Sequence, residues 1–315
     1  MALDAAISIG AESAYGVAAT TTEGYEGQAD SWKVAPEWIE SKGFRPDLQT
    51  TRADRRRIVD AGGEGTLELD LLDNGARSLL RGAFDVATSA GDTHTFSTAK
   101  DSTSPSFTAQ MVRPKVSGGT VAYKHTGCVA TEWELEQEVD AALKLTVTFD
   151  FQTVTHVGPV LPAVYPSEAV PYDWTCGVVY LTRGGVETAV AVTKWSAKGV
   201  RGFKTDRKHI RGNPLKAEPK RAETPAYEGE LEVEFSAETL PLYEDFVAGA
   251  VLGFRVAYVG VTGEAAFSLR APAIQFTGES PEASLDDLTQ MVLPFVILDP
   301  GNAPAVTVTY TEPGE

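Results

Sequence analysis

Carboxylates are the residues of this chain whose number and spacing could do chemistry. Glutamates alternate with apolar residues in three segments, and two neighbouring glutamates could act as the acid and the nucleophile of a glycoside hydrolase. Such a pair needs two environments that separate the pKa values of its members. The glutamates here instead recur in regular rows that we expect to be exposed. This regularity favours a structural surface over a catalytic pair.

Other reactive groups are sparse. The four histidines are scattered, without an HExxH motif or a helical i, i+4 pair that could build a metal site. Cys128 and Cys176 are too few for a disulfide framework and lack zinc-ligand spacing, so we expect both to pack in the interior. Neither a GxSxG elbow nor a GxxxxGK[ST] phosphate loop occurs. The sequence therefore predicts no catalytic residue, no cofactor, no metal and no enzyme activity.

The glutamate rows belong to predicted β-strands. In TEWELEQEV the acids project to one side of a strand and Trp133 and Leu135 to the other, and ELEVEF and TLELDL repeat the pattern. Within each strand no lysine offsets the like charges. These rows are either a solvated outer face or a surface that repels a polyanion passing close by. For the second alternative, the candidate lining residues are Glu132, Glu134, Glu136, Glu230, Glu232 and Glu234.

Two basic segments precede the acidic strands and are predicted to be long loops. They carry Arg52, Arg55, Arg56, Arg57, Lys204, Arg207, Lys208 and Arg211. Nucleic-acid binding is one interpretation, but no interleaved aromatics or recognised nucleic-acid fold accompany the charges. A solvated loop is another. We prefer docking onto the acidic surface of an identical neighbour, which makes these the candidate inter-subunit loops.

Composition indicates a mainly β protein. Among 315 residues, 43% are hydrophobic and 23% charged, which is enough for a sizeable core, and 29 glycines and 18 prolines suit frequent turns between short strands. The formal net charge of −17 should repel nucleic acid and anionic membranes. The sequence shows no bilayer-length apolar run and no secretory signal at its start. We therefore expect the protein to stay in a cytoplasm or to be released by lysis.

The order of elements suggests that the chain contains a duplication. Gly65 opens a period-2 strand followed by a short helix with Leu79, Leu80 and Phe84, and Gly229 opens the same two elements again. Downstream, residues 106–114 are matched with 266–272, and the segment from Tyr123 with that from Ile274. We expect five regions: an extended N-terminal arm (1–30), a first β domain (31–158), a Pro-rich joint (159–173), a second β domain (174–310) and a tail (311–315).

The same order of elements resembles that of the tail tube, or major tail, proteins of long-tailed, siphovirus-like bacteriophages. The resemblance rests on RADRRRIVDAGGE, GTLELDLLDNGARSLLRGAF and GGTVAYKHTGCVATEWELE in the first half, and on TPAYEGELEVEFSAETLPLYEDF and LTQMVLPFVILD in the second. It spans Arg52 to Asp299 and depends on order and spacing, because no single motif is diagnostic. It implies a β-sandwich or barrel domain with a short flanking helix. The duplication departs from the simplest members of the family, which have one domain per subunit, and gives two tandem β-sandwich or barrel domains, each with a short flanking helix.

The resemblance also implies a role and partners. Copies would form rings, three chains as a pseudo-hexamer or six chains, and the rings would stack into a tube whose acidic lining lets double-stranded DNA pass during genome ejection without specific binding. Tape measure, terminator and tail tip proteins would be further partners. The protein would belong to the virion, assembled in the host cytoplasm without a membrane. Other virion β proteins (terminator, adaptor or decoration protein) and a carbohydrate-binding β-sandwich are the alternatives.

Overall fold

A computed structural model describes residues 5–43, 46–47, 49–100, 104–278, 280 and 289–314 of the chain. It confirms the expected fold class, because 51% of the chain is strand and only 6% helix. Alternating burial along the strands shows why. In β7 and in the second half of β11 (132–138), every second side chain enters a single hydrophobic core that extends through both groups of strands.

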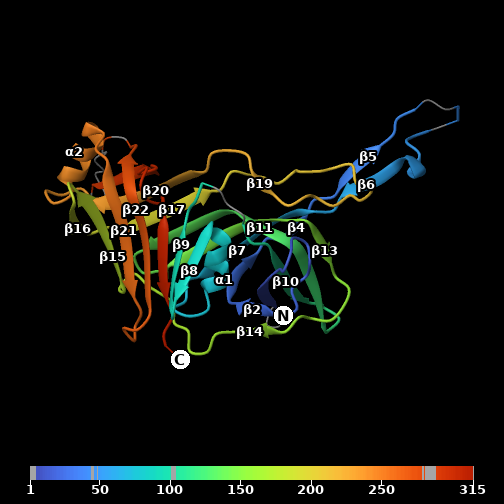
Figure 1. The fold of residues 1–315 in the computed structure, drawn as a ribbon, viewed down its shortest axis with the longest axis horizontal. Coiled ribbons are helices and arrows are strands. Elements are labelled where there is room, and N and C mark those ends of the chain that lie inside the picture. The colour runs from blue at the N-terminus through green and yellow to red at the C-terminus, as the bar shows by residue number, and fades with distance from the viewer. Residues whose placement is uncertain are drawn as a thin grey trace.

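Two consecutive groups of strands build the molecule (Figure 1). Unit 1 consists of β1 (Ala6–Ala11), β2 (Thr22–Tyr25), β3 (Gly27–Asp30), β4 (Lys33–Val34), β5 (Glu37–Glu40), η2 (Ala53–Arg55), β6 (Arg56–Asp60), β7 (Gly63–Asp70), α1 (Arg77–Ala83), β8 (Val86–Ala90), β9 (Thr93–Ser97), β10 (Phe107–Pro114), β11 (Thr120–Glu138), β12 (Lys144–Phe151) and β13 (Thr153–Thr155). After β14 (Ala163–Val164), unit 2 consists of β15 (Gly177–Arg183), β16 (Val186–Val190), β17 (Lys194–Val200), β18 (Phe203–Lys204), β19 (Lys220–Arg221), β20 (Ala226–Glu234), α2 (Leu240–Ala248), β21 (Leu252–Val259), β22 (Ala266–Phe276), β23 (Gln290–Ile297) and β24 (Thr307–Thr311).

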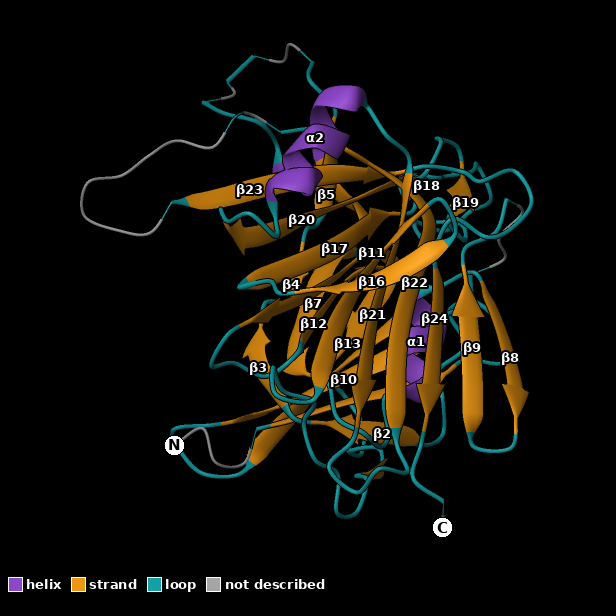
Figure 2. Ribbon diagram, turned by 90° about the vertical axis from the view of Figure 1, so that its left-hand side faces the viewer, coloured by secondary structure: helices purple, strands orange, loops and turns teal. Residues whose placement is uncertain are grey.

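One continuous sheet joins the two units (Figure 2). Its neighbouring strands run in the order β3, β7, β12, β11, β17, β20, β23 and β22, and all pairs are antiparallel. We call these eight strands the spanning sheet. Within the spanning sheet, the junction between the units is the pairing of β11 with β17, which extends from Glu132 opposite Val200 to Glu138 opposite Lys194. Outside it, β9 of unit 1 pairs with β24 of unit 2, from Ser97 opposite Thr307 to Thr93 opposite Thr311.

The strand pairing of unit 1 recurs in unit 2. Unit 1 has the order β2–β1–β10–β11–β12–β7–β3, and unit 2 the order β16–β15–β21–β22–β23–β20–β17. A helix follows β7 as it follows β20, and a two-stranded hairpin precedes each of these strands. This repeated topology supports the proposed internal duplication.

The strand equivalence corrects one detail of the sequence comparison. The sequence pattern aligns residues 106–114 with 266–272, but in the strand order β10 occupies the place of β21 and β11 that of β22. The register shifts agree with the new match, since they lie between Phe107 and Ala109 in one unit and between Leu252 and Phe254 in the other. The error arose from proline: Pro114 ends its strand, whereas Pro272 lies inside β22.

Two segments expected to lie outside the β domains pack against them. Residues 5–30 contribute β1, β2 and β3, and Ile7 and Ile9 of β1 are buried in the core. In the Pro-rich joint, Tyr172 is 1% exposed, and its backbone forms hydrogen bonds with Leu71, just after β7, and Leu143, just before β12. The segment that does project is the hairpin β5–β6, which extends from one end of the molecule while α2 lies at the other (Figure 1).

Candidate assembly surfaces

The six candidate lining glutamates lie on one side of the spanning sheet. β11 and β20 flank β17, and in this register Glu134 faces Lys198, which in turn faces Glu228. Residues directly opposite each other in antiparallel strands share a face. Ten carboxylates therefore form one surface, which we call the acidic face: Glu68, Asp70, Glu132, Glu134, Glu136, Glu138, Glu228, Glu230, Glu232 and Glu234.

Lysines of the neighbouring strands partly neutralise the acidic face. Lys194 Nζ lies 2.5 Å from both Glu136 Oε1 and Glu138 Oε1, and these hydrogen bonds raise the pKa of Lys194 and hold the pKa of Glu138 below its usual value. Lys198 Nζ lies 2.9 Å from Glu228 Oε1, and Lys144 Nζ 3.3 Å from Glu68 Oε1. Sequence reasoning missed this offset because it searched for lysines within each acidic strand, whereas β12 and β17 supply them across the ladder.

The acidic face keeps a net negative charge despite these pairs. Its ten carboxylates stand against the three lysines of β12 and β17 on the same side. Next to β20, the side continues over β23 with Val292, Pro294 and Val296, which carry no charge. The opposite side of the sheet packs into the core with Trp133 and Trp195, each 2% exposed or less.

The basic segment of unit 2 contacts unit 1 of the same chain. Lys208 Nζ lies 2.9 Å from Asp60 Oδ2 and 2.5 Å from Glu37 Oε2, both on the hairpin of unit 1. The other three cations bond within their own segment: Lys204 with Asp206, Arg207 with the Glu218 carbonyl, and Arg211 with the Leu215 carbonyl. The sequence predicted that these residues share one loop, but it did not predict the contact of that loop with unit 1.

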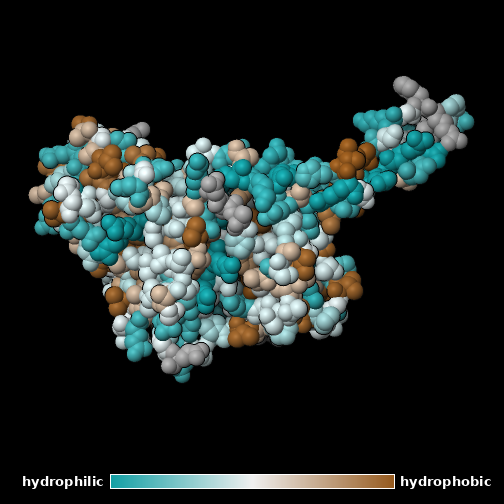
Figure 3. Space-filling model, in the orientation of Figure 1, coloured by the Kyte–Doolittle hydropathy of each residue, from teal (hydrophilic) through white to brown (hydrophobic). Residues whose placement is uncertain are grey.

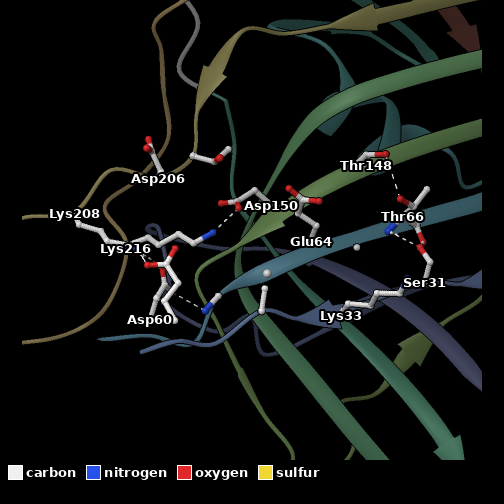
Figure 4. A pocket seen from close by; sticks show the side chains of 16 residues that line it. Ser31, Lys33, Asp60, Glu64, Thr66, Thr148, Asp150, Asp206, Lys208 and Lys216 are labelled. Atoms are coloured by element: carbon white, nitrogen blue, oxygen red, sulfur yellow. Dashed lines mark hydrogen bonds and ion pairs between the residues drawn. The ribbon is translucent and has the colours of Figure 1, made fainter. Parts of the chain in front are cut away.

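A polar pocket of about 570 Å³ lies where this loop meets the root of the hairpin (Figure 4). Lys216 Nζ donates a 2.6 Å hydrogen bond to Asp150 Oδ1, and burial raises the pKa of Asp150 to about 6. Lys208 and Asp60 pair beside it. These two ion pairs connect the loop of unit 2 with unit 1 across the pocket.

The basic segment of unit 1 is the projecting hairpin. Arg55, Arg56 and Arg57 are exposed, and the Arg56 guanidinium lies 4.5 Å from the centroid of the Trp38 ring. Arg52 pairs with Asp54 at 2.6 Å. Trp38, Ile39 and Ile58 on this hairpin are 46%, 60% and 46% exposed. We call residues 37–60, as far as the structure describes them, the arm; from here on this name does not refer to the N-terminal segment 1–30.

A buried arginine secures the junction of the units. Arg201, directly after β17, is 1% exposed, and its Nη1 donates to the carbonyls of Gly82 (2.6 Å) and Ala130 (3.0 Å). Its Nη2 lies 2.8 Å from Asp85 Oδ1, which also binds Arg221 at 3.0 Å. Burial lowers the pKa of Arg201 and Asp85 opposes that shift. These residues fix unit 2 against the end of α1.

Within the described ranges, no group of three or more histidine, cysteine, aspartate or glutamate side chains is placed to hold a metal ion. No helix in that part of the chain is long and apolar enough to cross a membrane. Among the described strands, β3 pairs only with β7, so its outer edge has no partner. Such an edge is a template for pairing with another chain.

An unpaired strand edge, an acidic sheet face and a projecting basic hairpin are surfaces suited to contacts between subunits of an assembly. The family of phage tail tube proteins matches residues 2–309, and the chain belongs to that family. It is thus a structural tail protein and a virion component. A search of curated proteins gave no match.

Proposed function

We propose that this chain is the repeating subunit of a tail tube, in which copies join edge to edge into rings and the rings stack. The observation that carries the proposal is the spanning sheet, an eight-stranded layer that shows one acidic side and leaves the edge of β3 without a partner. An unpaired edge is normally covered or closed into a barrel. A ring closes every such edge at once.

Three copies per ring are the preferred stoichiometry. The internal junction of β11 with β17 already joins two equivalent units, so three chains would present a six-fold wall. A ring of six chains remains the alternative. Terminator, tape measure and tail tip proteins would meet the ends or the interior of the stack, and assembly would take place in the host cytoplasm without a membrane. No catalytic role is proposed.

The acidic face is proposed to line the lumen. Its excess of carboxylates over lysines would repel the phosphates of double-stranded DNA, so that the genome moves through without binding. The repulsion acts over a distance of about 10 Å at moderate salt, which is the scale on which DNA would approach a close-fitting wall.

Electron microscopy and mass measurement of the purified chain test the ring. Tubes or stacked rings, with a ring mass equal to three or six chains, are expected, and a chain that stays monomeric under all conditions would refute the proposal.

Replacing Glu132 and Glu230 by lysine tests the lining. Neither glutamate forms an ion pair with a described residue, so assembly should persist while genome ejection slows. The matched control is Glu264→Lys in the exposed turn between β21 and β22. Ejection at the normal rate in the double variant would reject these glutamates as lining residues.

A further inference from the structure

Apolar side chains are exposed at both ends of the molecule (Figure 3). At one end they belong to the arm, where Ile39 is 60% exposed. At the other end they surround α2, where Val247 is 66% and Val251 59% exposed. Exposed apolar groups that gather on one element are typical of contact surfaces. The two ends face in opposite directions (Figure 1), so one copy cannot cover its own α2 with its own arm.

The interior of the chain shows how such surfaces are covered between two units. The segment from Arg201 to Arg221 leaves β17 of unit 2 and crosses unit 1. Arg201 donates to the Gly82 carbonyl at the end of α1, and Arg221 reaches Asp85 just beyond it. The segment then contacts the far side of unit 1 through Lys216 and Asp150, 2.6 Å apart. Unit 2 thus reaches over its neighbour.

The arm is the equivalent of that crossing segment. It lies between β3–β4 and β7 in unit 1, as the crossing segment lies between β17 and β20 in unit 2, and each contains one hairpin. The hairpins also share a cation–π contact: Arg201 lies 4.8 Å from the centroid of Phe203, and Arg56 lies 4.5 Å from that of Trp38. The two hairpins differ in their surroundings: the crossing segment lies over unit 1, whereas the arm projects from the molecule (Figure 1) and meets the crossing segment near its root, through Glu37 and Asp60.

The helices α1 and α2 differ in burial in the corresponding way. Four residues of the seven-residue α1 are buried, whereas Leu242 is the only buried residue of the nine-residue α2. Leu240 in α2 and Phe235 before it are exposed as well, at 40% and 38%. The side chains of Glu238 and Glu244 on and before α2 are exposed as well, and their charge complements the arginines of the arm.

We propose that the arm crosses unit 2 of the adjacent copy within the same ring and covers the apolar surface of α2. The occupant of α2 is therefore a second copy of this chain. This inference rests on the proposed ring and specifies its contact: the path of the crossing segment over unit 1 is repeated between chains. Arg55, Arg56 and Arg57 then approach Glu238 and Glu244, while Trp38, Ile39 and Ile58 meet Leu240 and Val247.

Photocrosslinking from the arm tests this path. With benzoylphenylalanine in place of Trp38, irradiation of assembled rings should link the arm to residues 235–251 of another copy. The crosslinked products should stop at the number of chains in one ring, because contacts within a ring close on themselves. The same photoreactive residue in place of Val116, which is fully exposed in the turn between β10 and β11, should give no link to this segment.

Other outcomes distinguish a failure of this inference from a failure of the proposed function. Links to segments other than 235–251 would overturn the arm's proposed path. Products that extend beyond one ring would show that the arm contacts the next ring and would overturn it too. A chain that forms no rings at all would refute the proposed function and this inference together.

A charged residue on α2 provides a second measurement. Val247→Asp leaves the core intact because the side chain is 66% exposed in the single copy. It should raise the protein concentration needed for ring formation about tenfold or more, since an interface anchor contributes upward of about 1.4 kcal/mol. Val116→Asp should leave that concentration unchanged. Equal assembly of Val247→Asp and wild type, at unchanged melting temperature, would refute the contact.

Discussion

The loss of Arg201 should strongly destabilise the protein through the junction between its two units. Its guanidinium is buried and donates to Gly82, Ala130 and Asp85. In Arg201→Met, the carbonyls of Gly82 and Ala130 lose the hydrogen bonds that Arg201 donates. Asp85 stays buried, and its remaining cation is Arg221. Removing one partner of a buried ion pair costs about 3–5 kcal/mol. Because Arg221 stays, we expect the lower end, about 3 kcal/mol.

Urea unfolding followed by tryptophan fluorescence measures this loss. Since one hydrophobic core extends through both units, we expect one transition whose midpoint falls in Arg201→Met without a change of slope. Lys204→Met is the control, because Lys204 is 56% exposed and lies 3.6 Å from Asp206. It should change the free energy of unfolding by less than about 0.5 kcal/mol.

A double-mutant cycle decides whether the ion pair itself is responsible. Combining Arg201→Met with Asp85→Asn should give a coupling energy above about 1 kcal/mol, because the two side chains are in direct contact at 2.8 Å. A loss below about 1 kcal/mol in Arg201→Met, or a cycle without coupling, would show that the strand pairings between the units, β11 with β17 and β9 with β24, hold them together without this contact.

Two further predictions concern charges on and beside the acidic face. Lys194→Met should lower the free energy of unfolding by about 1 kcal/mol, a difference that high salt reduces, whereas Lys100→Met at an exposed position should have no effect. Equal effects at low and high salt would contradict the electrostatic origin. Burial raises the pKa of Asp150 to about 6, above its unfolded value of about 3.9. The stability from its protonation is therefore complete below about pH 4 and lost as pH rises through 6, a change of roughly 2–3 kcal/mol. Calorimetry across this range should show that dependence weakened in Asp150→Asn and retained in Asp92→Asn; equal profiles for Asp150→Asn and wild type would refute it.

The local elements of the fold could be predicted because their signals are local. Period-2 alternation placed a strand at residues 66–71, and the structure has β7 at Gly63–Asp70. The helix expected around Leu79 and Leu80 is α1, and both side chains are buried. Such patterns depend on which face of an element enters the core, and that is visible in a single stretch of sequence.

Pairing between distant strands could not be predicted in the same way. The register that sets Glu134 opposite Lys198 joins strands of different units, and alternating strands offer several registers of similar hydrophobic fit. The acidic face was thus predicted for its glutamates but not for its lysines. Arg201 gave no signal at all, since its burial depends on carbonyls more than 70 residues earlier in the chain.

In the ring that we propose, the presence of two units in one chain changes the energetics of assembly. Every second junction is then an internal one like that of β11 with β17, and it forms without the loss of translational freedom that association between chains costs. The junctions between chains still bear that cost. The arm of unit 1 exposes Trp38, Ile39 and Ile58, whereas Phe203 in the equivalent hairpin is half-buried under two arginines. In the contact that we propose, the additional apolar surface of the arm lies at the junction between chains. Its burial there would offset the loss of translational freedom, and this gives a physical reason for the two hairpins to differ.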